Sequence, residues 1–293
     1  MMNIFRSGQN GRLMFCRKSQ PKIPAYASLL SLILAHLSYL VLISGMLFAP
    51  DTHAAEPQKV VLFVRELRSE SGEILPLRDN VRNVLTYFER QLHIQFEIHR
   101  YPLTRILAYT KNGEGLVFGL SKNRERLSQL VFSEAIYANT VWMITRSDNT
   151  FNFDSITDLK GKTIGIVRGA SYGDDFDKQS NVLFKVEDDV SSHSSRLKKL
   201  LNKRMDIMLL STSFTQAADV ENHLRQELRA EGQTDEQTIQ SGFVVLNKPL
   251  MSDDLHFAVA PGAGEVWINK LNQAIINGRK SGEIARLINA VKK

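Results

Sequence analysis

Short apolar runs alternate with segments of helical periodicity along most of this 293-residue chain. Residues 60–64 read VVLFV, a continuous apolar run typical of a buried strand. From Val81 onward, apolar residues recur at the three- and four-residue spacing of one helix face. Residues 94–98 then alternate like a strand, and residues 103–111 are expected to form a helix that ends at Asn112-Gly113. Strands that alternate with helices indicate α/β lobes with mostly parallel sheets.

The same alternation begins again after a polar stretch. Residues 146–158 have no apolar period, so we expect them to cross between two lobes, and residues 247–249 are a second candidate crossing. The run KTIGIV, a glycine-containing turn and a helix from Asp174 then open a second unit. Residues 215–241 are charged and predict one helix followed by a solvated loop. The chain ends in two segments of helical periodicity.

The N-terminus predicts export. Five basic residues precede an apolar run at about residues 25–49, and the small residues Ala54-Ala55 follow it. This order is typical of a secretory signal peptide, here residues 1–55, and it predicts a periplasmic protein. The run is long, so an uncleaved membrane anchor is the alternative.

The charge and cysteine content exclude two further classes. The whole chain carries a net charge of +6, but residues 1–55 hold five basic residues and one acidic residue, so the remainder carries only +2. Nucleic-acid binding needs a clustered basic surface, and this balance gives no general case for it. Cys16, the only cysteine, precedes the apolar run, so the mature chain would depend on its core and not on disulfides. The histidines show no metal-ligand spacing.

The sequence carries, in order, YPLTR, NGEG, SKNRERLSQLVFSEAIY, DLKGKTIGIVRGASYG, MDIMLLS, HFAVAPG and WINKLNQAIINGRKSGEIARLI. This ordered set resembles the periplasmic solute-binding proteins related to the polar amino-acid binders of ABC importers, over nearly all of residues 57–293. The resemblance implies the type II periplasmic-binding-protein fold: two α/β lobes, each a mixed and mostly parallel sheet flanked by helices, joined by two crossing strands. It places lobe one at residues 57–146 plus 251–293 and lobe two at residues 150–247.

The resemblance also implies a ligand cleft between the lobes. The arginine that holds the ligand lies six residues before the Phe of the FS pair, which is Arg126 here. The remaining candidates are the nearby hydroxyl Ser121, the turn residues Gly169, Ala170 and Ser171, Arg105 of YPLTR, and Ser211. A guanidinium presents a rigid fork of donors that fits a carboxylate, and a strand-to-helix turn offers backbone N–H groups to the same anion.

Three departures from the family pattern concern the ligand. Ser211 stands where relatives carry an acidic residue that holds the ligand's ammonium group. Gly115 replaces a common aspartate, and residues 65–68 (RELR) replace an aromatic platform. The expected ligand is therefore a small carboxylate-bearing solute, either amino-acid-like or another organic anion.

The expected protein is a monomer that does no chemistry and needs no cofactor or metal. Its expected partner is a membrane ABC permease or the periplasmic domain of a sensor. The first alternative is a sensory or interaction module that keeps the fold without transport.

Two enzyme hypotheses are also open. Residues 169–173 form G-x-S-x-G between a strand and a helix, which would suit a serine nucleophile, with His193, His223 or His256 and Asp206 as partners. A dehydratase acting on a carboxylated ring would need a cleft acid, for which Glu66 and Glu134 are available.

Overall fold

The computed structural model describes residues 56–289 except 70, 190–192, 231 and 234. Residues 57–293 form one compact unit. The predicted signal peptide, its cleavage site and Cys16 lie outside the described residues. Among the helices that are described, none is both long enough and apolar enough to span a bilayer.

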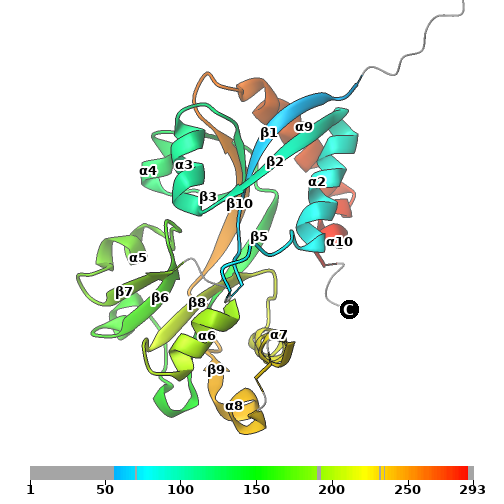
Figure 1. Cartoon of the computed structure of the whole chain (residues 1–293). Helices are drawn as coiled ribbons and strands as arrows, with labels where there is room; N and C mark the ends of the chain where they lie inside the picture. Colours follow the sequence, from blue (N-terminus) through cyan, green and yellow to red (C-terminus); the bar gives the residue numbers. More distant parts are fainter. Residues whose placement is uncertain (1–55, 70, 190–192, 231, 234, 290–293) are drawn as a thin grey trace, which may run out of the picture. The chain divides into compact units, whose positions relative to one another are not determined.

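Ten strands of the described chain form one continuous sheet. Its order is β2-β1-β3-β10-β5-β8-β6-β7, with β4 beside β10 and β9 beside β5 (Figure 1). Pairing is parallel at β1–β2, β1–β3, β6–β7 and β6–β8, and antiparallel wherever β5 or β10 takes part. The strands are β1 (Gln58–Arg65), β2 (Ile94–Tyr101), β3 (Leu116–Ser121), β4 (Val131–Phe132), β5 (Tyr137–Arg146), β6 (Thr163–Val167), β7 (Lys185–Asp189), β8 (Ile207–Thr212), β9 (Phe243–Val245) and β10 (Met251–Val259).

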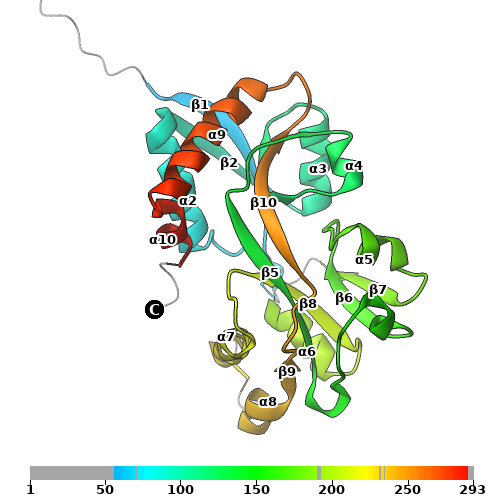
Figure 2. The same cartoon turned by 180° about the vertical axis from the view of Figure 1, so that it is seen from behind.

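Helices cover both faces of the sheet in each of two lobes, as Figures 1 and 2 show. In the first lobe, α2, α9 and α10 pack on one face of β1, β2 and β3, and α3 packs on the other. In the second lobe, α6, α7 and α8 cover one face of β5 and β8, and α5 covers the other. The helices are α2 (Asp79–Leu92), α3 (Leu103–Lys111), α4 (Arg124–Leu127), α5 (Asp174–Gln179), α6 (His193–Leu201), α7 (Ala217–Ala230), α8 (Glu236–Ser241), α9 (Glu265–Lys280) and α10 (Glu283–Asn289), with short 3₁₀ turns η1 (Ser147–Asn149) and η2 (Ile156–Leu159).

The expected two-lobed α/β architecture is thus confirmed, but the crossings lie elsewhere than expected. Strand β5 pairs with β10 through residues 137–141 and with β8 through residues 140–145, so β5 and β10 themselves run from one lobe into the other. Residues 147–158 instead form η1, η2 and connecting chain. The sequence did not indicate that β5 crosses between the lobes, because Val141–Ile144 has the pattern of an ordinary buried strand. Its side chains alternate between the two core faces of the second lobe.

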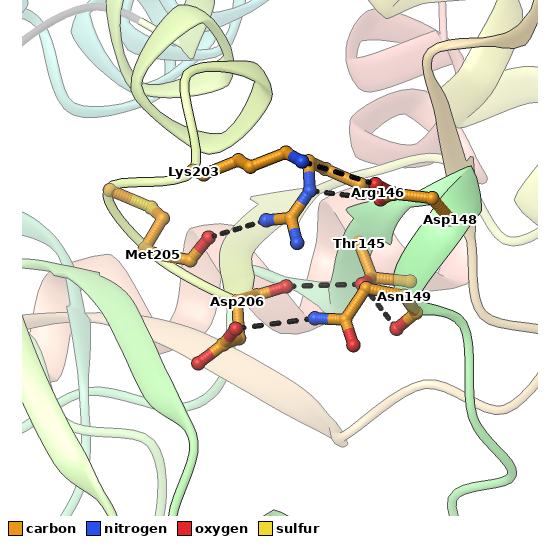
Figure 3. A network of polar contacts seen from close by, with 7 residues as sticks. All are labelled: Thr145, Arg146, Asp148, Asn149, Lys203, Met205 and Asp206. Atoms are coloured by element: carbon orange, nitrogen blue, oxygen red, sulfur yellow. Dashed lines mark hydrogen bonds and ion pairs between the residues drawn. The ribbon is translucent and has the colours of Figure 1, made fainter.

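A polar network holds the end of β5 against the start of β8 (Figure 3). Thr145 Oγ1 donates to the backbone oxygens of Asn149 and Asp206, at 3.1 and 3.0 Å. The Asp206 carboxylate accepts from Asn149 Nδ2 at 3.2 Å and from the Thr163 backbone N–H at 2.8 Å. Arg146 Nη1 donates to the Met205 backbone oxygen at 3.2 Å. These contacts fix the base of the second lobe.

One further expectation was wrong. The solvated loop predicted before residue 241 contains a second helix, α8, whose Ile239 is fully buried in the second-lobe core. Asp235 caps this helix by accepting from the Gln237 N–H, a signal that the charged surroundings obscured. The predicted strands at residues 60–64 and 94–98, the helix at residues 103–111 and the two C-terminal helices are confirmed.

Candidate functional site

A cavity of about 200 Å³ lies where strands of both lobes end. The parallel strands β1, β3 and β6 point their carboxyl ends toward it, which is the usual place for ligands in α/β sheets. Its walls come from both lobes. The polar residues that line it are Arg65, Arg78, Arg100, Ser121, Arg126, Tyr137, Asn139, Ser171, Tyr172, His193, Arg196, Ser211 and Asp253.

Arg126 lines this cavity and is only 5% exposed. It lies in the short helix α4, whose start is fixed by the Asn123 side chain accepting from the Arg126 backbone N–H at 2.8 Å. Its Nη1 donates to the Ser121 backbone oxygen at 2.9 Å, and its Nη2 donates to the Gly169 backbone oxygen at 2.7 Å. Burial lowers the pKa of Arg126, opposed by the nearby carboxylates of Asp177 and Asp253. The guanidinium therefore connects the first lobe to the turn after β6.

Ser121 ends β3 beside a buried acid that the sequence did not single out for the site. Ser121 Oγ donates to Asp253 Oδ2 at 2.8 Å. Asp253 is 7% exposed, and burial raises its pKa to about 6 despite the Ser121 hydrogen bond and the Arg126 charge. A carboxyl group of this kind exchanges its proton near neutral pH.

The turn after β6 already uses several of the donors that an anion would need. The Ala170 N–H donates to the Val167 oxygen at 3.0 Å, and the Tyr172 N–H donates to Asp177 Oδ1 at 3.0 Å. Ser171 is buried and its hydroxyl donates to Asp177 Oδ2. Ala170 and Ser171 line the cavity, but the Asp177 carboxylate makes this turn a weaker anion site than the sequence indicated.

Two other candidates have different surroundings. Ser211 lines the cavity and accepts from Asn139 Nδ2 at 3.1 Å, so the two side chains form a neutral polar pair in its wall. Arg105 is exposed, lies outside the cavity wall and places its guanidinium carbon 5.6 Å from the centre of the Tyr101 ring. The structure therefore groups Arg126, Ser121, Ala170, Ser171 and Ser211 around one cavity. Gly169 contacts this group because its backbone oxygen accepts from Arg126, and Arg105 lies outside the cavity wall.

Sequence reasoning missed a group of basic side chains in the cavity wall. Arg65 ends β1, and burial lowers its pKa to about 10, opposed by Tyr172 and assisted by the charges of Arg196 and Arg78. Arg78 precedes α2 and places Nη2 3.2 Å from Nδ1 of His193. Burial lowers the pKa of His193 to about 4, so this imidazole is neutral at pH 7. A signal was available, because Arg65 directly follows a buried run whose carboxyl end faces a ligand in folds of this kind.

Tyr137 adds a neutral donor to the same wall. Burial raises the pKa of its phenol to about 12, although Arg78 and Arg65 favour the ionised form. The hydroxyl group therefore keeps its proton throughout the physiological range.

Most of the groups named by the two enzyme hypotheses have other partners. Ser171 donates to Asp177 and not to a histidine, and the Asp206 carboxylate is held in the network of Figure 3. Glu66 is buried and forms an ion pair with Arg68 at 2.6 Å, while Glu134 is exposed. Within residues 56–289 as described, no cluster of three or more His, Cys, Asp or Glu side chains has the arrangement of a metal site.

No family model and no curated protein matches the chain. Solved structures do share its fold. The substrate-binding protein of an amino-acid ABC transporter is 17% identical, with a TM-score of 0.58 over 80% of this chain and 100% of that one. The GluR0 ligand-binding core from Nostoc punctiforme, in complex with L-glutamate, is 15% identical, with a TM-score of 0.58 over 79% and 98%. The ancestral amino-acid-binding protein AncCDT-1, a precursor of cyclohexadienyl dehydratase, is 14% identical, with a TM-score of 0.58 over 80% and 96%. The chain therefore has the two-lobed, type II periplasmic binding fold.

Proposed function

We propose that this protein is an extracytoplasmic solute-binding protein that captures a small anionic solute between its two lobes, without catalysis. The observation that carries the proposal is Arg126, a buried guanidinium in the wall of a cavity built by both lobes. Two of its donors hold the Ser121 and Gly169 oxygens. A guanidinium has five N–H donors, so further donors remain for a carboxylate.

Closure of the lobes follows from where these contacts lie. The sequence-based division gives lobe one residues 57–146 plus 251–293 and lobe two residues 150–247. We place the boundary within β5 instead, because Val141–Ile144 pack in the second-lobe core. Arg126 reaches the Gly169 oxygen of lobe two. A solute that contacts both lobes would add to this link only in the closed form, so binding would shift the population toward closure.

The proposed partner is a membrane ABC permease that recognises the closed form. The solved structures of this fold include a substrate-binding protein of an amino-acid ABC transporter, which supports this choice. Export through the predicted signal at residues 1–55 would place a monomeric carrier in the periplasm.

A sensory module is the second candidate. Ser211 and Asn139 form a neutral pair. By its resemblance to polar amino-acid binders an acid would be expected at Ser211, so the ligand preference would differ from theirs. The ligand-binding core of GluR0 has the same fold. Sequencing the N-terminus of the exported protein separates the two: a terminus at Ala55 or Glu56 favours a diffusing carrier, and an intact residue 1 favours a tethered module.

A thermal-shift screen tests the proposed function. Protein purified from cells that express the full chain is heated with small carboxylates, amino acids and neutral sugars. A specific ligand stabilises the folded state by mass action. We expect anionic solutes to raise the melting temperature and neutral sugars to leave it unchanged. Stabilisation by neutral sugars alone would contradict the proposal.

A further inference from the structure

The cavity wall holds far more positive than negative charge. Five arginines line it, namely Arg65, Arg78, Arg100, Arg126 and Arg196, and Asp253 is the single carboxylate among the described lining residues. Other acids near the wall are held by partners. Asp177 accepts from the Ser171 hydroxyl and from the Tyr172 N–H at 3.0 Å. Glu66 pairs with Arg68 at 2.6 Å, and Glu227 lies 3.1 Å from His223 and 3.7 Å from His193.

Most of these guanidiniums are held by backbone oxygens. Arg196 donates to the Gly165 and Leu209 oxygens at 2.9 and 2.7 Å. Arg100 donates to the Leu75 oxygen. Arg126 donates to the Ser121 and Gly169 oxygens. These hydrogen bonds fix the three side chains in place.

Arg65 and Arg78 differ from the other three. The Arg65 guanidinium has no hydrogen bond and no ion pair with any side chain or backbone oxygen of the described residues. Arg78 has a single hydrogen-bonding neighbour in that part of the chain, the His193 ring, at 3.2 Å. An imidazole is neutral or positive and so never supplies a charge opposite to a guanidinium; this one is neutral at pH 7.

A half-buried guanidinium without a counter-charge is costly, and Arg78 adds a second positive charge near Arg65 although its own side chain is exposed. The positive charges of Arg196 and Arg78 act on Arg65 in the same direction as burial does. An anion from solution would remove this cost, whereas a solute ammonium group would add to it. The neutral Tyr137 hydroxyl on the same wall supplies a further donor.

We propose that Arg65 and Arg78 form a second anion subsite, so that the cavity takes a small organic dianion with one negative group at Arg126 and the other at this pair. The inference rests on the proposed solute-binding function and specifies its substrate class. Dicarboxylates and small acids that carry both a carboxylate and a phosphate share this chemistry.

Matched pairs of solutes test the second subsite by isothermal titration calorimetry at pH 7.5. Succinate is compared with butyrate, and phosphoglycolate with glycolate, so that each pair differs in one anionic group. The protein is the form that cells produce from the full chain. We expect at least one dianion to bind about tenfold or more tightly than its monoanion partner, since one buried charge pair is worth at least that factor. Binding of succinate would indicate a dicarboxylate ligand, and binding of phosphoglycolate would indicate a phosphorylated acid.

Variants then assign the effect to residues. Arg65→Gln should weaken binding of the dianion by about tenfold or more, and Arg78→Gln, whose side chain is exposed, by about two- to fivefold. Both variants should leave binding of the monoanion unchanged within about twofold. Arg82→Gln is the matched control, because Arg82 lies one turn further along α2 and is exposed. The proposal is overturned if dianions bind no more tightly than monoanions, if no dianion binds, or if Arg65→Gln and Arg78→Gln weaken both solutes equally.

Two readouts distinguish a binding role of Arg65 from a structural one and from the role of Arg126. The melting temperature of ligand-free Arg65→Gln should equal or exceed that of the wild type, because a repelling charge is removed. A lower melting temperature would show that Arg65 is structural and would contradict the subsite. If Arg126→Gln leaves every affinity unchanged while Arg65→Gln and Arg78→Gln do not, the Arg126 part of the proposed function fails and the second subsite stands.

Discussion

Asp253 is buried in the candidate site, and its burial could not be predicted from the sequence. It is half of the Asp253-Asp254 pair, and neighbours along a chain rarely act on one ligand together. In β10, successive side chains point to opposite faces, so Asp253 is buried beside Ser121 while Asp254 is exposed. The sequence contains the alternation, but the burial depends on β5 and β3, which pair on either side of β10 from distant parts of the chain.

Asp253→Asn should change how stability depends on pH. The pKa of Asp253 is about 6 in the folded protein against 3.8 for an unperturbed side chain, so the folded state holds a proton that the unfolded chain has released. Its contribution to stability is greatest below about pH 4 and is lost as the pH rises through about 6. An asparagine still accepts from Ser121 and carries no charge.

Urea unfolding of the ligand-free protein from pH 4 to pH 8 measures this effect. We expect the stability advantage of Asp253→Asn over wild type to grow from near zero at about pH 4 to about 1–3 kcal/mol at pH 7. His193, whose pKa is lowered to about 4, contributes the opposite slope equally to both proteins, so the comparison isolates Asp253. An unchanged slope in the variant would refute the assignment.

At the scale of elements, the turn between β6 and α5 depends on a glycine at the lobe boundary. Gly169 has φ +77°, and a Cβ there would lie 2.9 Å from Thr104 Cγ2 at the start of α3. The sequence identified the turn because glycines follow a buried strand. It did not indicate the Thr104 contact, because that contact depends on how the two lobes meet.

Gly169→Ala should therefore cost more than backbone strain alone. Gly262 has the same φ of +77°, and a Cβ there would meet no atom within 4 Å, so Gly262→Ala isolates the conformational cost of about 1 kcal/mol. We expect Gly169→Ala to lower the free energy of unfolding by about 1–2 kcal/mol more and to weaken solute binding as well. Equal losses in stability and unchanged affinity in both variants would show that the close approach to Thr104 is unimportant.

At the scale of the whole folded unit, local periodicity predicted the elements and their α/β class. It did not predict the route between the lobes, because β5 looks like an ordinary buried strand and its two sets of partners come from both lobes. It also did not assemble the basic wall, since Arg65, Arg78 and Arg196 are separated along the chain and meet only at the cavity. The resemblance to a known family supplied Arg126 and the lobes, and the structure supplied the charges around them.

Lobe closure is testable by the distance between spin labels. Val266 in α9 and Val182 after α5 are both exposed, so Val266→Cys and Val182→Cys in a Cys16→Ser chain give one label on each lobe. We expect pulsed electron paramagnetic resonance to show a broad distribution of label-to-label distances without solute. Solute should narrow and shift that distribution, because it favours the closed population. Identical distributions would contradict closure on binding.

The most direct test of the central claim, that Arg126 holds an anionic solute between the lobes, is calorimetry with two neighbouring arginines. Arg126 is 5% exposed in the cavity wall, whereas the Arg124 side chain of the same helix is 78% exposed. Using the tightest anionic solute of the screen, we predict that Arg126→Ala weakens binding by about tenfold to several thousandfold, while Arg124→Ala changes it by less than about threefold. Unchanged affinity in Arg126→Ala, with wild-type folding, would contradict the claim.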